Sequence, residues 1–301
     1  MGQSSGHSSI NKNLVLLHCT VLVWGFTGTL GRLISIPAVG LVWYRVLIAT
    51  ASLFTYFIIS KTDFRVNKMS LFKLVANGAL VGGHWILFFA SIKLSTVAVT
   101  LVCLSSMTLF TAILEPLINK KRISKLEILS GILIICGIVL IFKFETRYTK
   151  GIIFGLTSAL FASLFAIFNS KLVKNLKAPV IAFYELSGAI LWITIFLILT
   201  NGFNKTIIPT HADIVYLVLL GTICTSVAYV MGVYVMRELS AFRVALITNL
   251  EPVYGIIIAF FFFGDLNKMT PGFWAGAIVI LSTIMLYPVT QKQLSKRRNR
   301  Q

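Results

Sequence analysis

The chain has 301 residues, of which 57% are hydrophobic and only 12% charged, and its mean hydropathy is +0.90. These values exclude an ordinary water-soluble globular protein and predict an integral membrane protein. The net charge of +18 would suit a nucleic-acid-binding protein, but in a membrane chain basic residues first report which helix ends face the cytoplasm.

Apolar runs long enough to cross a hydrocarbon core about 30 Å thick recur from one end of the chain to the other. They predict an all-α polytopic membrane protein with ten transmembrane helices and connections too short to hold a soluble domain. The predicted spans are residues 14–33, 39–59, 74–92, 97–118, 128–144, 151–170, 180–200, 214–236, 244–263 and 272–289. The four cysteines all fall within these spans, without C-x-x-C spacing, and are expected to be free and buried.

Basic residues are distributed unevenly between the two sides of these spans. If the N-terminus is cytoplasmic, most of the 27 Lys and Arg residues, including those of the C-terminal "KQLSKRRNRQ", lie at cytoplasmic ends and loops. Both termini are therefore predicted to be cytoplasmic, in a cell membrane that is the bacterial inner or plasma membrane. Topology and attraction to anionic lipid head groups account for the charge, so no nucleic-acid partner is expected.

The two halves of the chain, 1–145 and 146–301, resemble each other weakly but consistently. "IKLSTVAVTL" at 92–101 parallels "RELSAFRVAL" at 237–246, and "WYRVLIA" at 43–49 parallels "FYELSGA" at 183–189. Each half holds five predicted helices, an odd number, so the second half must enter the membrane from the opposite side. Such inverted repeats are the architecture of many secondary transporters.

Several motifs carry a resemblance to a known family. They are Trp24-Gly25 in the first span, "YRVLIA" in the second, "FFASIKLSTVAVT" at 88–100, and the block from 221 to 281 with its "LEP" and the acidic turn Gly264-Asp265. With these motifs the chain resembles the ten-helix drug/metabolite transporter superfamily, specifically proteins with two EamA domains. The resemblance covers nearly the whole chain. It implies movement of amino acids, related metabolites or toxic compounds across the cytoplasmic membrane, commonly outward.

One candidate site lies in "ITNLEPVYG", near the middle of the ninth span. Pro252 has no N–H, so it frees the carbonyl of Thr248 and interrupts the helix beside Asn249 and Glu251. A helix broken at mid-membrane is tolerated where it lines protein or water. Glu251 could there hold a substrate ammonium group or a proton; the alternative is a carboxyl group that only locks helix packing.

Two further charges lie inside predicted spans. Arg45 begins about 9 Å below the outer face at 1.5 Å per residue, and could clamp a substrate carboxylate. Glu185 is its repeat partner, entered from the inner face. Depth argues against a direct pair, so each is a candidate gate on one side of a central site, with interhelical bonding as the alternative.

His84 and Trp85 follow two glycines in the third span and complete the set of substrate-binding or gating candidates. A histidine can titrate near neutrality, and the glycines would allow a ligand or helix to approach closely. A packing role for His84 is the alternative.

The sequence contains no G-x-S-x-G, H-E-x-x-H or Walker-type motif, so we expect no catalytic site, no metal and no cofactor. The predicted function is a secondary transporter that moves small organic molecules by alternating access, in the direction of export. Proton coupling is open, and so is the oligomeric state. The alternative is a channel or lipid scramblase.

Overall fold

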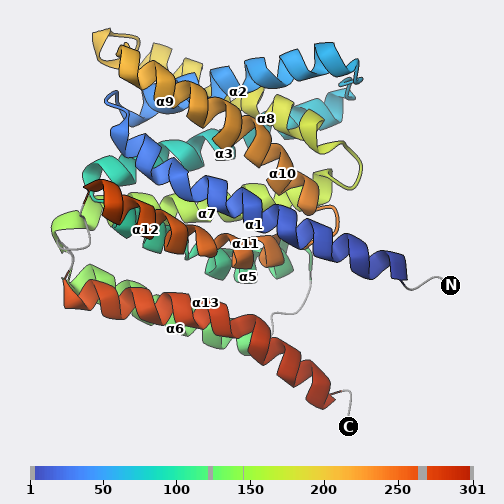
Figure 1. The fold of residues 1–301 in the computed structure, drawn as a ribbon, viewed down its shortest axis with the longest axis vertical. Coiled ribbons are helices and arrows are strands. Elements are labelled where there is room, and N and C mark those ends of the chain that lie inside the picture. The colour runs from blue at the N-terminus through green and yellow to red at the C-terminus, as the bar shows by residue number, and fades with distance from the viewer. Residues whose placement is uncertain (1–3, 121–124, 145, 264–269, 299–301) are drawn as a thin grey trace.

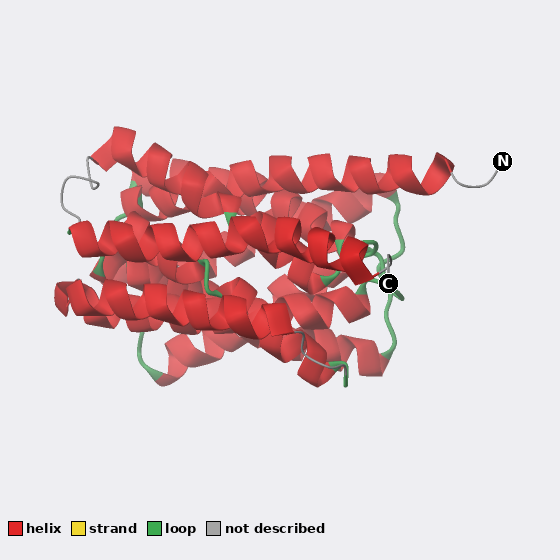
Figure 2. Ribbon diagram, turned by 90° about the horizontal axis from the view of Figure 1, so that it is seen from below, coloured by secondary structure: helices red, strands yellow, loops and turns green. Residues whose placement is uncertain are grey.

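The computed structural model describes residues 4–120, 125–144, 146–263 and 270–298, and this part of the chain contains helices and loops but no strand. Most helices run along one common direction and form an elongated bundle (Figures 1 and 2). The first half holds α1 (Ser4–Leu33), α2 (Ala38–Ser60), α3 (Lys68–Leu94), α4 (Val97–Leu104), α5 (Met107–Ile118) and α6 (Lys125–Phe144). The second half holds η1 (Thr146–Tyr148), α7 (Thr149–Leu172), α8 (Ala178–Leu199), η2 (Lys205–Ile207), α9 (His211–Gly221), η3 (Thr222–Val227), α10 (Ala228–Val235), α11 (Ala241–Thr248), α12 (Leu250–Phe263) and α13 (Pro271–Arg298).

Eight helical stretches of the described chain are long and apolar enough to cross a membrane, and each coincides with a predicted span. Two shorter apolar helices, Leu129–Ile141 and Pro271–Tyr287, occupy the places of the fifth and tenth predicted spans. The N-terminal end of α1 and the C-terminal end of α13 lie at the same end of the bundle (Figure 2). Ten crossings and a cytoplasmic position for both termini stay predictions. The predicted turn at Gly264 and Asp265 falls outside the described residues.

Helix starts in this bundle are set by ordinary capping chemistry. The Thr96 side chain accepts a hydrogen bond from Val99 N–H at 3.1 Å at the start of α4, and Ser240 accepts one from Arg243 N–H at 3.3 Å at the start of α11. Each cap satisfies one of the amide groups that a helix start leaves without an intrahelical partner. These two caps fix where the interrupted helices of the two halves begin.

Helix packing follows the same pattern in both halves. Helix α1 packs on α12 just as α7 packs on α4 and α5, and α2 packs on α9 just as α8 packs on α3. Helices α6 and α13 pack on each other and lie together along one side of the bundle (Figure 1). Their backbones approach at Gly137 and Gly276, where a Cβ on Gly276 would lie 2.6 Å from the Gly137 carbonyl oxygen. Small residues at a helix crossing permit this approach.

Three of the predicted spans are not continuous α-helices. The interruption predicted in the ninth span is confirmed, because α11 ends at Thr248 and α12 begins at Leu250. The fourth span, which we expected to be unbroken, is also interrupted, because α4 ends at Leu104 and α5 begins at Met107. No proline lies at this second break. Ser106 Oγ donates to the Cys103 carbonyl oxygen at 2.6 Å, which is a side-chain bond that competes with helix continuation.

The third interruption is the π-helix η3 between α9 and α10. Here Thr225 Oγ1 donates to the Leu220 carbonyl oxygen, five residues earlier, over 2.6 Å. Single π-turns inside α-helices are rare and are frequent at functional sites. The cysteines are free as predicted, but Cys19 and Cys136 are exposed rather than buried. Their helix faces lie on the outside of the bundle, where an apolar residue needs no protein cover.

Candidate functional site

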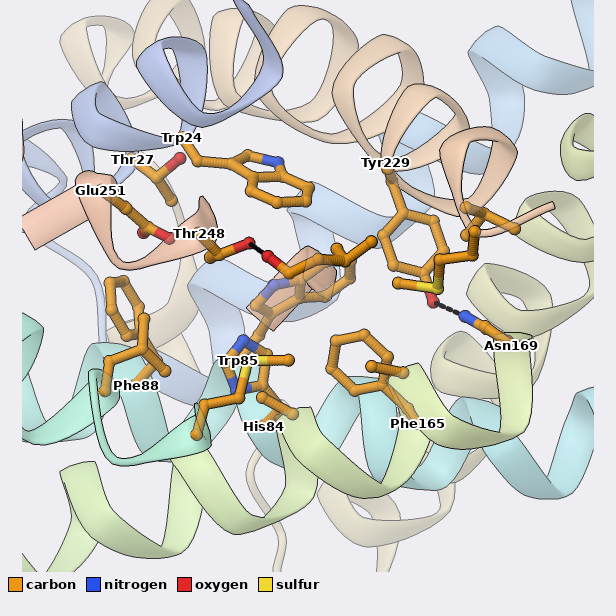
Figure 3. A pocket seen from close by; sticks show the side chains of 18 of the residues that line it. Trp24, Thr27, His84, Trp85, Phe88, Phe165, Asn169, Tyr229, Thr248 and Glu251 are labelled. Carbon is orange, nitrogen blue, oxygen red and sulfur yellow. Dashed lines mark hydrogen bonds between the residues drawn. The ribbon is translucent and has the colours of Figure 1, made fainter. Parts of the chain in front are cut away.

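A cavity of about 80 Å³ lies between the two halves of the chain. The first half lines it with residues of α1 to α5, and the second half with residues of α7 and α10 to α12. Its wall is mostly apolar and aromatic, and a few polar side chains converge on it (Figure 3). The polar side chains are Thr27, Arg45, His84, Asn169, Tyr229, Thr248 and Glu251. This composition is typical of sites for small organic ligands.

The α4–α5 break and the α11–α12 break both open onto this cavity. Leu104 and Met107 line it from the two sides of the α4–α5 break, and Thr248 and Glu251 line it from the two sides of the α11–α12 break. Irregular backbone at membrane depth is tolerated where it lines such a space, because protein or water can then satisfy its polar groups. The two breaks therefore mark the same site from opposite halves of the chain.

Arg45 reaches the cavity from α2 with its side chain 1% exposed. Its Nε donates to Thr225 Oγ1 over 2.5 Å, and its guanidinium lies 4.1 Å above the Trp85 ring centroid. Its Nη1 is buried and has no hydrogen-bond partner in the described chain. A cation–π contact is worth about 0.5–2 kcal/mol but does not satisfy this N–H group, so Arg45 retains donor capacity at the cavity.

Glu251 enters the same cavity from the first turn of α12 and is 6% exposed. The Arg45 guanidinium acts electrostatically on the Glu251 carboxyl group. In the described residues no ion pair joins the two, and no hydrogen bond from a side chain holds the Glu251 carboxyl group. The cavity thus presents one cationic and one acidic group that are not bonded to each other.

His84 and Trp85 both line the cavity, as their candidacy requires. His84 Nδ1 lies 3.0 Å from the Ser158 carbonyl oxygen, and Ser158 Oγ donates to the His84 carbonyl oxygen at 2.9 Å. Because a carbonyl oxygen only accepts, this arrangement places the imidazole hydrogen on Nδ1. His84 therefore connects α3 to α7 while its ring faces the cavity.

Glu185 does not line the cavity. It is 0% exposed and bonds to Asn77 and to two cavity residues, Asn169 and Tyr229. Arg45 and Glu185 have separate partners in the described chain, as the depth argument requires.

Asn249 and Pro252 also lie outside the cavity lining. The Asn249 amide donates to Thr108 Oγ1 in α5 and to the Ala245 carbonyl oxygen at 3.0 Å, so it joins the α11–α12 break to the other interrupted helix. Pro252 is buried beside Glu251, where the absence of its N–H supports the break.

Several residues of the site were not singled out from the sequence. Thr225, Asn77, Asn169 and Ser158 are polar residues in apolar spans, but their types are common in transmembrane helices and nothing in the pattern distinguishes them. The Ser105-Ser106 pair was the one local indication of the first break, because adjacent serines can bond to helix carbonyl groups.

The family model of the EamA-like transporter family matches this chain twice, at residues 11–143 and 149–287. No curated protein sequence matches it. Twenty-nine chains of solved structures are similar to it. One crystal structure aligns with 93% of this chain and 98% of its own, at 13% sequence identity and a TM-score of 0.68, and so shows a common fold. The cavity thus lies between two repeats of one domain type, and the chain belongs to the EamA-like transporter family of the drug/metabolite transporter superfamily, as a membrane transporter rather than an enzyme.

Proposed function

We propose that the cavity is the substrate site of an alternating-access carrier for small zwitterions, namely amino acids or related metabolites. The observation that carries this proposal is the presence of Arg45 and Glu251 in one small cavity without a bond between them. A molecule with a carboxylate and an ammonium group would supply the missing partner to each.

The energetics favour a bound anion at Arg45. A buried cation with an unsatisfied N–H group is costly, and a carboxylate that accepts from Nη1 would remove that cost. The bond to Thr225 and the Trp85 ring fix the guanidinium plane in advance, so little side-chain entropy is lost on binding.

The volume of the cavity favours a compact substrate. Its 80 Å³ can hold several water molecules, since about 10–15 Å³ suffices for one. Sites for drug-sized ligands measure about 300–1,000 Å³, so a larger cargo would require the helices to separate.

Alternating access is supported by where the cavity lies. In transporters built from inverted repeats, the substrate binds near mid-membrane at the repeat interface, among discontinuous helices. Here both repeats contribute one interrupted helix to the cavity. The direction we propose is export, on the family resemblance alone. The membrane we propose is the bacterial inner or plasma membrane, with both termini cytoplasmic on the distribution of basic residues.

The test is counterflow in proteoliposomes that contain the full chain and a labelled amino-acid mixture. Each amino acid that gives counterflow is then compared, as an inhibitor, with its carboxamide and with the carboxylic acid that lacks its amino group. Arg45→Lys should weaken inhibition by the carboxylic acid, and Glu251→Gln should weaken inhibition by the carboxamide.

Glu115→Gln is the matched control, because Glu115 accepts a hydrogen bond from the Phe242 backbone N–H at 2.9 Å and lies outside the cavity. This variant should keep the inhibition pattern of the unmodified chain. Equal inhibition by all three compounds in every variant would refute the zwitterion site. Pore-like leak or lipid flipping without counterflow would favour the channel or scramblase instead.

A further inference from the structure

A second polar cluster lies beside the cavity, around Glu185 of α8. Its Oε1 accepts from Asn77 Nδ2 at 2.6 Å, and its Oε2 accepts from Tyr229 OH at 2.6 Å and from Asn169 Nδ2 at 3.1 Å. The side chain is 0% exposed, and within the described chain its bonding partners are all uncharged. Among the described residues, no cation bonds to this carboxyl group to hold it in the ionised form, so its charge can change by binding a proton.

This cluster separates two spaces. Asn169 and Tyr229 line the central cavity, whereas Asn77 lines a groove of about 500 Å³ between α3 and α7. Lys73 lines the same groove, near the predicted cytoplasmic end of α3. Glu185 therefore bonds to one side chain that lines the groove, Asn77, and to two that line the cavity, Asn169 and Tyr229.

The amide groups of the cluster suit both charge states of the carboxyl group. Asn77 Oδ1 is buried and has no hydrogen-bond partner, while Nδ2 of the same amide contacts Glu185. A half-turn of the amide would present Oδ1 to the hydroxyl group of a protonated Glu185. Asn169 bonds to Asn77 and to Glu185. Its amide also carries a donor group and an acceptor group, so it can turn together with the Asn77 amide.

The cluster is also connected to the candidate substrate site. The Arg45 guanidinium lies on the Trp85 ring, and that ring meets the Tyr229 ring edge-on at a centroid distance of 5.7 Å. The Tyr229 hydroxyl donates to Glu185. A ligand that moves Arg45 would therefore act on the group that holds the Glu185 carboxyl group.

We propose that Glu185 is the proton-binding site that couples substrate movement to a proton gradient. It would exchange protons with the groove past Asn77 and with the cavity past Tyr229 and Asn169. In each exchange one proton from water adds to a carboxylate oxygen, and the same proton later leaves. The coupling role rests on the proposed transport of zwitterions, whereas the proton site itself does not.

The charged and titratable groups near this site are few. Helix α8 packs against α2, α3 and α10. Tyr229 from α10 contacts Glu185 directly, and Arg45 from α2 is turned toward Thr225 and Trp85. Lys73 from α3 and Lys171 from α7 both line the groove.

Two measurements on the full chain in proteoliposomes test the proposal. Infrared difference spectra between acidic and alkaline buffer, without substrate, should contain a protonated-carboxyl band that Glu185→Gln abolishes and Glu115→Gln keeps. With the labelled amino-acid mixture, Glu185→Gln should abolish accumulation driven by a pH gradient and retain counterflow, which is driven by preloaded unlabelled substrate and needs no pH gradient. A residue with only a structural role would not separate these two activities.

The proposal is overturned if the band or gradient-driven accumulation persists in Glu185→Gln, or if the folded variant loses counterflow as well. If Glu185→Gln does not fold, Asn77→Ala replaces it and should shift the pH at which the band is half-formed. Ser70→Ala, in the same groove, is the control and should leave that pH unchanged. An unshifted pH in Asn77→Ala overturns the proposed proton site. If the unmodified chain shows no counterflow, the proposed function fails, and the infrared band alone supports or overturns the proton site.

Discussion

Arg45 Nε donates a hydrogen bond to Thr225 Oγ1 over 2.5 Å, which joins α2 of the first repeat to the π-helix η3 of the second. The same threonine hydroxyl donates to the Leu220 carbonyl oxygen, so its hydrogen is occupied and its lone pairs face the guanidinium. The irregular turn thus positions an acceptor where the candidate substrate-binding arginine needs one.

Thr225→Val should weaken substrate binding, because valine has a similar shape but cannot accept the bond from Arg45. A hydrogen bond to a charged group is worth about 1.5–3 kcal/mol, so the KM for counterflow should rise about tenfold or more. Thr222→Val is the control, since that hydroxyl bonds only to the Val218 carbonyl oxygen of its own helix. An unchanged KM in Thr225→Val would show that the bond does not orient Arg45 for binding.

The double substitution Ser105→Ala and Ser106→Ala should restore helix continuity between α4 and α5. Both hydroxyl groups bond to backbone carbonyl oxygens at the break, and alanine has the highest helix propensity. We expect the maximal rate of counterflow to fall while the protein stays folded. Ser187→Ala, which removes a similar bond to the Phe183 carbonyl oxygen in an unbroken helix, should leave the rate unchanged. If the double variant and Ser187→Ala had the same maximal rate of counterflow, a role for the break would be contradicted.

Gly78→Ala should force α3 and α8 apart. A Cβ at this position would overlap the Glu185 carbonyl oxygen, and one at Gly188, across the same contact, would lie 2.7 Å from the Val75 carbonyl oxygen. Overpacking of this kind costs about 1–3 kcal/mol, which thermal unfolding in detergent would detect. At Gly82 in the same helix a Cβ would meet only side-chain atoms, the nearest at 3.3 Å. Gly82→Ala should therefore be the milder change, and the reverse order would show the α3–α8 contact to be looser than described.

Ser158→Ala should destabilise the contact between α3 and α7. Ser158 Oγ donates to the His84 carbonyl oxygen at 2.9 Å and lies 2.8 Å from His84 Nδ1. The Ser158 backbone carbonyl oxygen still accepts from His84 Nδ1 in this variant, so only the hydroxyl bond is lost; such a bond is worth about 0.5–1.5 kcal/mol, and the unfolding temperature in detergent should fall slightly. Thr157→Ala, one residue away, removes an exposed bond within α7 and should have a smaller effect. If both variants unfold alike, the Ser158 hydroxyl group does not contribute to the α3–α7 contact.

Hydropathy was sufficient to locate the spans, because the requirement for about 20 apolar residues leaves few alternatives. The break at Asn249 was predictable from Pro252, since a missing N–H is a property of one residue. At the matching position the first repeat has Met107, so its break depends on serine side chains that can equally bond within an intact helix. The sequence therefore predicted one of the three interruptions and neither the α4–α5 break nor the π-helix η3.

The partners of the charged residues could not be predicted. Glu185 bonds to Asn77, Asn169 and Tyr229, which belong to three different helices and are as many as 108 positions away in the chain. Which helix faces meet depends on tertiary packing, and periodicity in apolar helices says little about it, because lipid and protein interior are both apolar. The charged candidate residues could be recognised in the sequence because a charge buried in the membrane is costly. Their neutral partners have no comparable cost and so could not be recognised.

The α6–α13 pair has a consequence for the energetics of transport. These helices pack on each other, and no described residue of either lines the cavity. A contact that is the same in two conformations contributes equally to the free energy of both and cancels from their equilibrium. If the pair moves as a unit, substitutions such as Gly137→Ala would change the amount of folded carrier. They would not change the equilibrium of the folded carrier between its two oppositely open conformations.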